Sequence, residues 1–196
     1  MADDQTLKFY ADNAATYVQH ASGVPSRQLV AFADALPQGG AVLELGTGSG
    51  KDAAYLLSRG FDVQPSDGSP ELAEQAERLI GRKVCIMRFD QLEDEQAYDG
   101  VWASASLLHA PADELTDDLS RIHRALRSGG LCVASFKAGS GEGRDRFGRY
   151  YNYPDAETLL AYFRDAADWA ELTLSLHMGG GYDGEPTEWL WVTARR

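Results

Sequence analysis

A glycine-rich turn is the feature that most constrains what this chain can fold into. Residues 42–50 read VLELGTGSG, so an apolar strand pattern carrying one acid runs directly into three alternating glycines. A helix pattern follows from Lys51 to Ser58. Glycine adopts dihedrals that a Cβ forbids and lets a ligand approach the backbone, while the free N–H groups of the next helix attract electron-rich atoms. The run therefore predicts a nucleotide-type binding turn after the first strand of a parallel α/β sheet.

The spacing of these glycines indicates which cofactor the turn binds. A dinucleotide fingerprint, G-x-G-x-x-G, needs a glycine where Lys51 stands, and no G-K-[ST] triplet marks a phosphate-binding loop. The pattern is instead E-x-G-x-G-x-G, which resembles motif I of class I S-adenosylmethionine (SAM) dependent methyltransferases. This resemblance implies SAM as the cofactor. The residues that it assigns to the cofactor in this turn are Glu44, Gly46, Thr47, Gly48 and Gly50. For Glu44 the alternative is an acid that stabilises the turn or the helix dipole.

A second acid is expected where the next strand ends, because there it grips the two ribose hydroxyls. Residues 61–65 form the strand pattern, Asp67 and Gly68 follow it, and Ser69-Pro70-Glu71 then opens a helix with a capping residue, a proline and an early acid. Asp67 is therefore the predicted ribose ligand. Asp62 competes for this role, but it lies at the start of the strand, away from the ligand edge.

Two further segments match the same family. A third strand, predicted over residues 83–88, ends at Phe89-Asp90, and the resemblance implies that Asp90 and the adjacent Gln91 contact the adenine. The alternative for Asp90 is an ordinary surface carboxylate. A fourth strand over residues 98–104 leads into 105–111, which resembles motif IV beside the methyl donor and adds Ser106 to the cofactor contacts. Within 122–136 the run L-R-S-G-G-L resembles the family's turn before strand five, with Ser128 in place of the usual proline.

These matches cover roughly residues 40–137 in the family's order, and agreement at several levels is stronger evidence than any one motif. They imply a Rossmann-like, doubly wound α/β fold with helices on both faces of a seven-stranded, mostly parallel sheet. The expected strand order is 3-2-1-4-5-7-6, with strand 7 antiparallel. In such a sheet the ligand lies beyond the carboxyl ends of the strands where the order reverses, here between strands 1 and 4.

The chain is expected to form one domain, 1–196, in three parts. Residues 5–37 predict a cap of two helices, broken near residues 23–25. Residues 38–137 form the SAM-binding half. Residues 138–196 predict a substrate loop, a helix over 155–168, and a hairpin whose strands cover 171–178 and 188–194.

The acceptor site is expected at the loop after strand five, residues 138–153, where glycines alternate with arginines and tyrosines. Glycines supply mobility, while arginine and aromatic side chains supply anion capture and stacking, so the loop reads as a lid over a small planar or anionic acceptor. The alternative is a surface loop whose arginines pair with Asp145 and Glu142. The predicted substrate-binding residues are Arg144, Arg146, Tyr150, Tyr151 and, in the last hairpin, His177.

Residues 9–17 resemble the Y-x-x-x-A-x-x-Y start of many small methyltransferases, in which a tyrosine touches the cofactor. Tyr10 and Tyr17 lie seven residues apart on one helical face, as cofactor contacts or as packing residues. His109, just beyond strand four, is the candidate general base, with packing as its alternative role. His20 and His123 lie on predicted helices and are expected to be structural.

The composition of the chain limits the classes of molecule that it is expected to bind. The net charge of −12 disfavours nucleic acid and anionic membranes, no apolar stretch is long enough to span a bilayer, and no Cys/His cluster predicts a metal. Cys85 and Cys132 each lie in an apolar run and are expected to be buried in a cytoplasmic protein. The residues thus predict a SAM-dependent methyltransferase of a small molecule, as a monomer or homodimer, and its size and layout resemble small bacterial methyltransferases of types 11 and 12 or the tellurite-resistance type. The alternatives are a catalytically silent SAM-binding subunit and a nicotinamide-dependent oxidoreductase.

Overall fold

A computed structural model describes residues 3–19, 24–182 and 184–196. A central seven-stranded sheet has the order β3-β2-β1-β4-β5-β9-β8. The strands from β1 to β5 run parallel, and β9 is antiparallel to both of its neighbours. Their bounds are β1 Ala41–Leu45, β2 Asp62–Asp67, β3 Cys85–Ile86, β4 Tyr98–Ala103, β5 Leu126–Lys137, β8 Glu171–Gly180 and β9 Pro186–Arg195.

A separate two-stranded sheet, β6 Glu142–Arg144 with β7 Tyr150–Asn152, lies between β5 and the last hairpin in the chain. When these two strands are set aside, β8 and β9 are the sixth and seventh strands, and the order of the main sheet is 3-2-1-4-5-7-6. The predicted Rossmann-like α/β class is confirmed.

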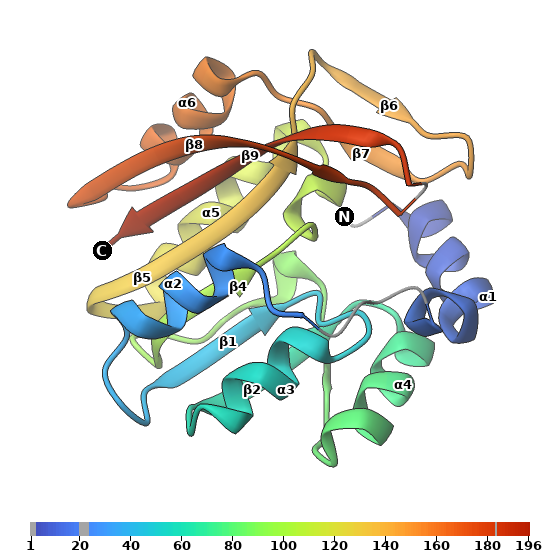
Figure 1. The fold of residues 1–196 in the computed structure, drawn as a ribbon. Helices are drawn as coiled ribbons and strands as arrows, with labels where there is room; N and C mark the ends of the chain where they lie inside the picture. The colour runs from blue at the N-terminus through green and yellow to red at the C-terminus, as the bar shows by residue number, and fades with distance from the viewer. Residues whose placement is uncertain (1–2, 20–23, 183) are drawn as a thin grey trace.

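Helices cover both faces of the sheet (Figure 1). On one face, α2 and α3 pack on the strands around Phe32 and Trp102, and α4 packs beside α3. On the other face, α5 and α6 pack around Leu43, Phe136 and Phe163. The central strands are apolar on both sides because both sides are covered. The helix bounds are α1 Asp4–Gln19, α2 Arg27–Ala35, α3 Lys51–Ser58, α4 Pro70–Ile80, α5 Ala112–Ala125 and α6 Ala156–Ala166, with short 3-10 turns η1 Phe89–Gln91 and η2 Leu107–His109.

Local sequence signals explain where several helices begin. The Ser26 side chain accepts a hydrogen bond from the N–H of Leu29 at the start of α2, and Ser69 does the same for Leu72 at the start of α4. A serine at the N-cap satisfies a backbone donor that has no partner inside the helix. The Ser69 cap fixes the start of α4, the helix that follows Asp67.

The structure corrects three details of the sequence analysis. The third strand is only two residues long, and Cys85 on it is exposed, not buried, because β3 is an edge strand that pairs with β2 alone. Cys132 is buried as expected. The second strand extends to Asp67, which is its last residue. The segment after β5 is not an irregular loop, because most of it forms the β6–β7 hairpin.

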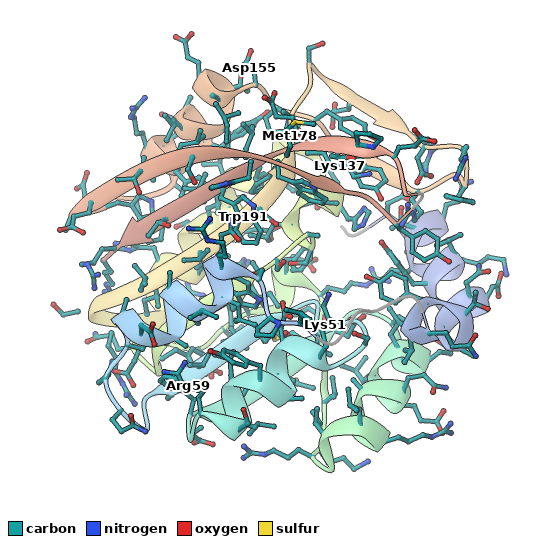
Figure 2. All side chains as sticks on the ribbon, in the orientation of Figure 1. Lys51, Arg59, Lys137, Asp155, Met178 and Trp191 are labelled. Carbon is teal, nitrogen blue, oxygen red and sulfur yellow. The ribbon has the colours of Figure 1, made fainter. Side chains whose placement is uncertain are left out.

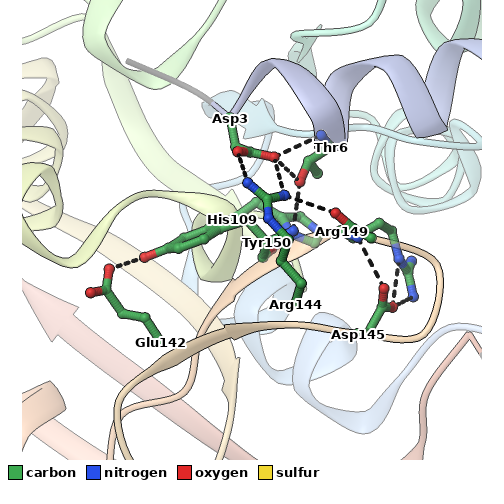
Figure 3. Close-up of polar contacts among 9 residues, drawn as sticks. Asp3, Thr6, His109, Glu142, Arg144, Asp145, Arg149 and Tyr150 are labelled. Atoms are coloured by element: carbon green, nitrogen blue, oxygen red, sulfur yellow. Dashed lines mark hydrogen bonds and ion pairs between the residues drawn. The ribbon is translucent and has the colours of Figure 1, made fainter.

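Helix α1 stands at the carboxyl end of the sheet, beside the β6–β7 hairpin and against α4 (Figure 1). Hydrogen bonds at the N-terminal end of α1 join this region to the hairpin (Figure 3). The guanidinium of Arg144 donates two hydrogen bonds to the carboxylate of Asp3, at 2.6 and 2.9 Å, and the backbone N–H of Tyr150 donates to the hydroxyl of Thr6 at 2.7 Å. Two segments more than 140 residues apart in the sequence thus form one cover over this end of the sheet. Within the described residues, no helix combines the length and the apolar character that crossing a membrane requires.

Candidate active site

A first cavity opens at the carboxyl ends of β1, β2, β3 and β4, the edge that the sequence predicted. It measures about 640 Å³ including its open mouth. Helix α1 covers it from above with Tyr10 and Tyr17. The remaining walls come from the glycine turn, the end of β2, the segment after β3 and the turn after β4. They are Gly46, Gly48, Asp67, Gly68, Leu72, Met87, Arg88, Phe89, Ala105, Ser106 and His109, with Asp3, Thr6 and Leu7 of the N-terminal segment.

The glycines of the turn have different tasks. Gly46 has φ of 74°, and a Cβ on it would lie 2.5 Å from the Cβ of Ser106, so a side chain there would collide with the opposite wall. Gly48 has φ of 55° and faces the ring of Tyr17. Gly50 has φ of 80° and packs against Ala76 of α4, which makes it a helix-packing position. Left-handed dihedrals of this kind favour glycine. Gly46 and Gly48 keep the cavity open, and Gly50 lets α3 and α4 approach each other.

Asp67 closes the far side of this turn. Its carboxylate accepts hydrogen bonds from the N–H of Gly48 and the N–H of Ser69, both at 2.9 Å. Burial raises the pKa of this carboxyl, and the backbone donors oppose the shift. An acid at this place, buried yet lining the cavity, can accept hydrogen bonds from a pair of ligand hydroxyls.

Glu44 and Thr47 lie beneath the cavity side of the glycine turn. They line neither this first cavity nor the second cavity described below. The hydroxyl of Thr47 donates to the carboxylate of Glu44, and both residues are buried. Burial, with a smaller contribution from Asp52, raises the pKa of Glu44 to about 8. In this arrangement Glu44 supports the turn from below.

The wall after β3 differs from the sequence analysis. Met87, Arg88 and Phe89 line the first cavity, whereas Asp90 and Gln91 do not. Both of the latter are exposed, and the side chain of Gln91 accepts from the backbone N–H of Arg88. The short turn η1 directs the two predicted adenine contacts away from the cavity and leaves the backbone and side chains of residues 87–89 facing it.

A second cavity adjoins the first under the β6–β7 hairpin and the β8–β9 turn, and measures about 1180 Å³ including its open mouth. Its walls combine aromatic and cationic side chains. They are Tyr10, Tyr17, Ser49, Lys51, Ala105, Leu108, His109, Lys137, Arg149, Tyr151, Gly180, Gly181, Tyr182, Gly184 and Trp189. Lys51 and Lys137 come from the start of α3 and the end of β5 (Figure 2). The residues common to both cavities are Tyr10, Tyr17, Ala105 and His109, so these mark the boundary between them.

His109 is half-buried at this boundary, and both of its ring nitrogens have hydrogen-bond partners. Its Nδ1 lies 2.6 Å from the backbone oxygen of Tyr150, and its Nε2 lies 2.9 Å from the hydroxyl of Tyr10. Burial lowers the pKa of this imidazole to about 4, although the bond to Tyr150 opposes the shift. His109 is therefore neutral near pH 7. The preceding turn is strained, because Ala105 has φ of 51°, and backbone strain of this kind gathers at functional sites.

Arg149 lines the second cavity and is a candidate functional residue that the sequence analysis did not name. Its side chain is 1% exposed and donates to the Asp145 carboxylate at 2.7 and 2.9 Å. Five aromatic rings surround the guanidinium with centroids 5.0–5.7 Å away: those of Phe9, Tyr10, Phe147, Tyr151 and Tyr182. Burial alone would lower the pKa of Arg149, but the neighbouring tyrosines and Asp145 raise it overall. Arg149 thus joins α1, the hairpin and the β8–β9 turn.

The predicted substrate residues fall in different places. Tyr151 lines the second cavity, and the backbone of Tyr150 orients His109 while its hydroxyl contacts Glu142. Arg144 is bound to Asp3, and Arg146 is exposed with its guanidinium 4.8 Å from the ring centroid of Phe147. Neither arginine lines a cavity, nor does the exposed His177, which contacts Ser175.

Of the two remaining histidines, the structure describes one, which lies on α5. His123 packs edge-on against Trp169, and His20 lies outside the described residues. Across residues 3–19, 24–182 and 184–196, no group of three His, Cys, Asp or Glu side chains is placed to hold a metal ion.

Comparisons with known proteins agree with this geometry. Residues 42–130 match the family model described as a methyltransferase domain. Over 100 residues, the chain is 36% identical to protein-L-isoaspartate O-methyltransferase from Chlorobium phaeobacteroides. That match covers 48% of this chain, which spans only 43% of the length of that enzyme.

Solved structures match over nearly the whole chain. The 1,6-didemethyltoxoflavin-N1-methyltransferase of Burkholderia thailandensis, solved with its acceptor and S-adenosylhomocysteine, is 26% identical with a TM-score of 0.73, over 97% of this chain and 84% of that chain. The CcbJ methyltransferase of Streptomyces caelestis shares the fold, with 18% identity and a TM-score of 0.74 over 98% and 99% of the two chains. SAM is the cofactor that these findings support.

The residues of the first cavity fit that cofactor. The hydroxyl oxygen of Ser106 is buried at its wall and, among the described residues, has no hydrogen-bond partner. A buried polar atom of this kind needs a ligand or water to satisfy it. Opposite it, Gly46 leaves open the space that a Cβ would fill, and Asp67 supplies an acceptor for hydroxyls. The nucleoside part of SAM would be held by Gly48, Asp67 and Ser106, below Tyr10 and Tyr17.

Proposed function

We propose, from the premise that this chain belongs to the class I SAM-dependent methyltransferases, that it transfers a methyl group to a small planar acceptor held in the second cavity. The observation that carries the proposal is the boundary at Tyr10, Tyr17, Ala105 and His109, where the two cavities meet. A methyl donor in one cavity and an acceptor in the other would face each other there. The similar Burkholderia enzyme is a methyltransferase of 1,6-didemethyltoxoflavin, and this supports a small-molecule acceptor.

The walls of the second cavity indicate the shape and charge of the acceptor. Tyr17 and Tyr182 stack with ring centroids 5.4 Å apart and an interplanar angle of 20°. Trp189 and Tyr151 add flat surface on the side of β5. Flat aromatic walls favour a flat ligand, because stacked rings bury much surface at little conformational cost.

Cations in the same cavity favour an acceptor with negative charge. Lys137 is buried, with its ammonium 4.7 Å from the centroid of Tyr151 and 6.0 Å from that of Trp189. Lys51 and Arg149 also line this cavity, and Asp145 bonds Arg149 from behind. Because a charge in a poorly solvated cavity interacts more strongly than one in water, an acidic ring system would be held better here than a neutral one.

The chain's own contribution is placement and exclusion of water. SAM supplies a methyl group already activated on a sulfonium, so the protein needs to bring the reacting atoms together at roughly 3–3.5 Å. Tyr10 and Tyr17 cover the junction, and the bonds of Arg144 to Asp3 hold the helix that carries both tyrosines. His109 at the junction is neutral near pH 7 and is able to accept a proton.

A SAM-binding subunit without catalytic activity would not need a second cavity lined by five tyrosine and tryptophan side chains and three cationic side chains. A nicotinamide-dependent oxidoreductase is disfavoured by the glycine spacing and by the family of the relatives. The second cavity therefore favours a small-molecule methyltransferase over both alternatives.

The test is a methyl-transfer screen followed by one cavity variant. Purified protein is incubated with SAM and a panel of planar phenols, planar N-heterocycles and an isoaspartyl peptide, and S-adenosylhomocysteine (SAH) release is measured. Transfer to planar acids, with KM raised at least about tenfold in Lys137→Met, is the expected result. The matched control is Lys83→Met, because the side chain of Lys83 is 93% exposed and pairs with Glu77 at the surface. Transfer to the peptide alone, or an unchanged KM in Lys137→Met, would contradict the proposal.

A further inference from the structure

We propose that Tyr10 is a catalytic residue: its phenol oxygen takes the proton of the acceptor while its own proton passes to Nε2 of His109. This inference rests on the proposed methyl transfer and deepens it. The sequence analysis assigned Tyr10 to the cofactor and His109 alone to base catalysis. The contacts at the cavity boundary connect the two residues in series.

The direction of each hydrogen bond follows from chemistry. The backbone oxygen of Tyr150 has no proton to give, so Nδ1 of His109, 2.6 Å away, carries the ring proton. The neutral imidazole then has its lone pair on Nε2, and the hydroxyl of Tyr10, 2.9 Å away, must donate to it. The guanidinium of Arg149 donates to the Tyr10 oxygen at 3.1 Å. The chain of donors therefore runs from Arg149 through Tyr10 to His109, and from His109 to Tyr150.

This arrangement leaves the Tyr10 oxygen with one free place. A phenol oxygen accepts two hydrogen bonds, and Arg149 fills one of them. Tyr10 lines both cavities. The relay requires a ligand at the boundary to meet this second lone pair. Nε2 of His109 is already engaged by Tyr10, and a proton from the acceptor therefore reaches the imidazole through the phenol.

In the proposed methyl transfer, the acceptor's O–H or N–H proton moves to the Tyr10 oxygen as the Tyr10 proton moves to Nε2 of His109. A bond forms between the acceptor's oxygen or nitrogen and the methyl carbon, and the carbon–sulfur bond breaks with its electron pair going to sulfur. The positive charge that leaves the sulfonium appears on the His109 imidazolium, which the Tyr150 carbonyl stabilises through Nδ1–H. The phenol ends with one proton, as it began.

Several ionisable groups surround this pair and set its proton affinity. They come from every element packed against it: Tyr17 of α1, Asp67 of β2, Lys137 of β5, and Asp145, Arg149 and Tyr151 of the hairpin segment. Arg149 and Lys137 favour loss of a proton from the pair, and Asp145 opposes it. None of these groups replaces Tyr10 between the cavity and His109.

The relay defines a substrate class. The atom that receives the methyl group must bring a proton, so we expect a weakly acidic ring O–H or N–H. Thiols that ionise before binding would not need Tyr10. The probes are 7-hydroxycoumarin, 4-nitrophenol and 2,4-dihydroxyquinoline for O–H, and xanthine for N–H.

The kinetic test compares Tyr10→Phe with Tyr55→Phe. Tyr55 is a matched control because its hydroxyl also accepts from an arginine, Arg59 at 2.6 Å, but lies on α3 outside both cavities. We expect Tyr10→Phe to lower kcat about 10²–10³-fold for the un-ionised probe, and the deficit to shrink to about threefold at pH values where the probe is already ionised. A purely structural role would give the same deficit at every pH. A kcat within about threefold of wild type for the un-ionised probe would overturn the relay.

A second measurement needs no acceptor. Ring ¹⁵N NMR of His109 in the SAH complex should show a neutral imidazole with the proton on Nδ1 and an Nε2 that accepts a hydrogen bond, which Tyr10→Phe removes. A proton on Nε2 in the wild type would overturn the relay. SAH binding without methyl transfer to any probe would contradict the proposed function and its substrate class, whereas transfer that is insensitive to Tyr10→Phe would contradict the relay alone.

Discussion

Replacing Asp67 with asparagine should weaken SAH binding about 10- to 100-fold. The carboxylate uses one oxygen for the N–H of Gly48 and the other for the N–H of Ser69, each at 2.9 Å, while it also lines the first cavity. Asparagine keeps one accepting oxygen and presents an NH₂ group in place of the other. It therefore loses one charge-assisted hydrogen bond to a ribose hydroxyl, which is worth about 1.5–3 kcal/mol, and every 1.4 kcal/mol is tenfold in affinity.

Isothermal titration with SAH measures this directly. Asp62→Asn is the matched control, because Asp62 lies at the other end of the same strand, is 74% exposed at its side chain, and pairs with Arg82 at 3.2 Å. Its Kd should equal that of the wild type. Thermal denaturation of both variants checks that each is folded. Equal SAH affinity for wild type and folded Asp67→Asn would refute the assignment of the ribose site.

The remaining predictions concern SAH binding at the wall of the first cavity, the stability supplied by Arg149, and the pH dependence of unfolding. Gly46→Ala should abolish detectable SAH binding in calorimetry, because the new Cβ would meet Ser106 at 2.5 Å; wild-type affinity would show that the ligand avoids this turn. Arg149→Met should lower the free energy of unfolding by about 3–5 kcal/mol in urea denaturation, since it leaves the Asp145 carboxylate nearly buried without its partner. A loss under about 1 kcal/mol would contradict a stabilising role for this ion pair. Burial raises the pKa of Glu44 to about 8 from 4.5, so the folded state holds a proton that the unfolded chain releases, and this contribution to stability is lost as pH rises through 8. Glu44→Gln should therefore flatten the fall in unfolding free energy between pH 6.5 and 8, and an unchanged slope would place the proton elsewhere.

Short-range signals account for the parts of the fold that the sequence predicted well. Helix α3 covers Lys51–Ser58 as expected, and α2 begins after the Ser26 cap. The strand order was what the resemblance of the serial motifs to class I methyltransferases implies, and the structure has that order. The rule that ligands gather where the order reverses then located the cavity. The third strand was overestimated because Lys83–Arg88 carries apolar residues on an edge where only β2 offers pairing.

The acceptor side was harder to predict because its contacts are long-range. Arg149 directly precedes the tyrosine-rich stretch 150–153 and looks like its neighbours Arg144 and Arg146 in the sequence. Its burial depends on rings from residues 9, 10 and 182, which no local pattern links to it. Asp90 and Gln91 show the converse, because a one-turn 3-10 helix was enough to point them away from the cavity.

A crystal structure of the SAH complex would test directly whether donor and acceptor occupy the two adjoining cavities. We expect the ribose hydroxyls to contact Asp67. We expect the sulfur to lie at the boundary between the cavities and to face the second cavity; that boundary is formed by Tyr10, Tyr17, Ala105 and His109. A sulfur turned away from that boundary, or a nucleoside bound outside the first cavity, would contradict this arrangement.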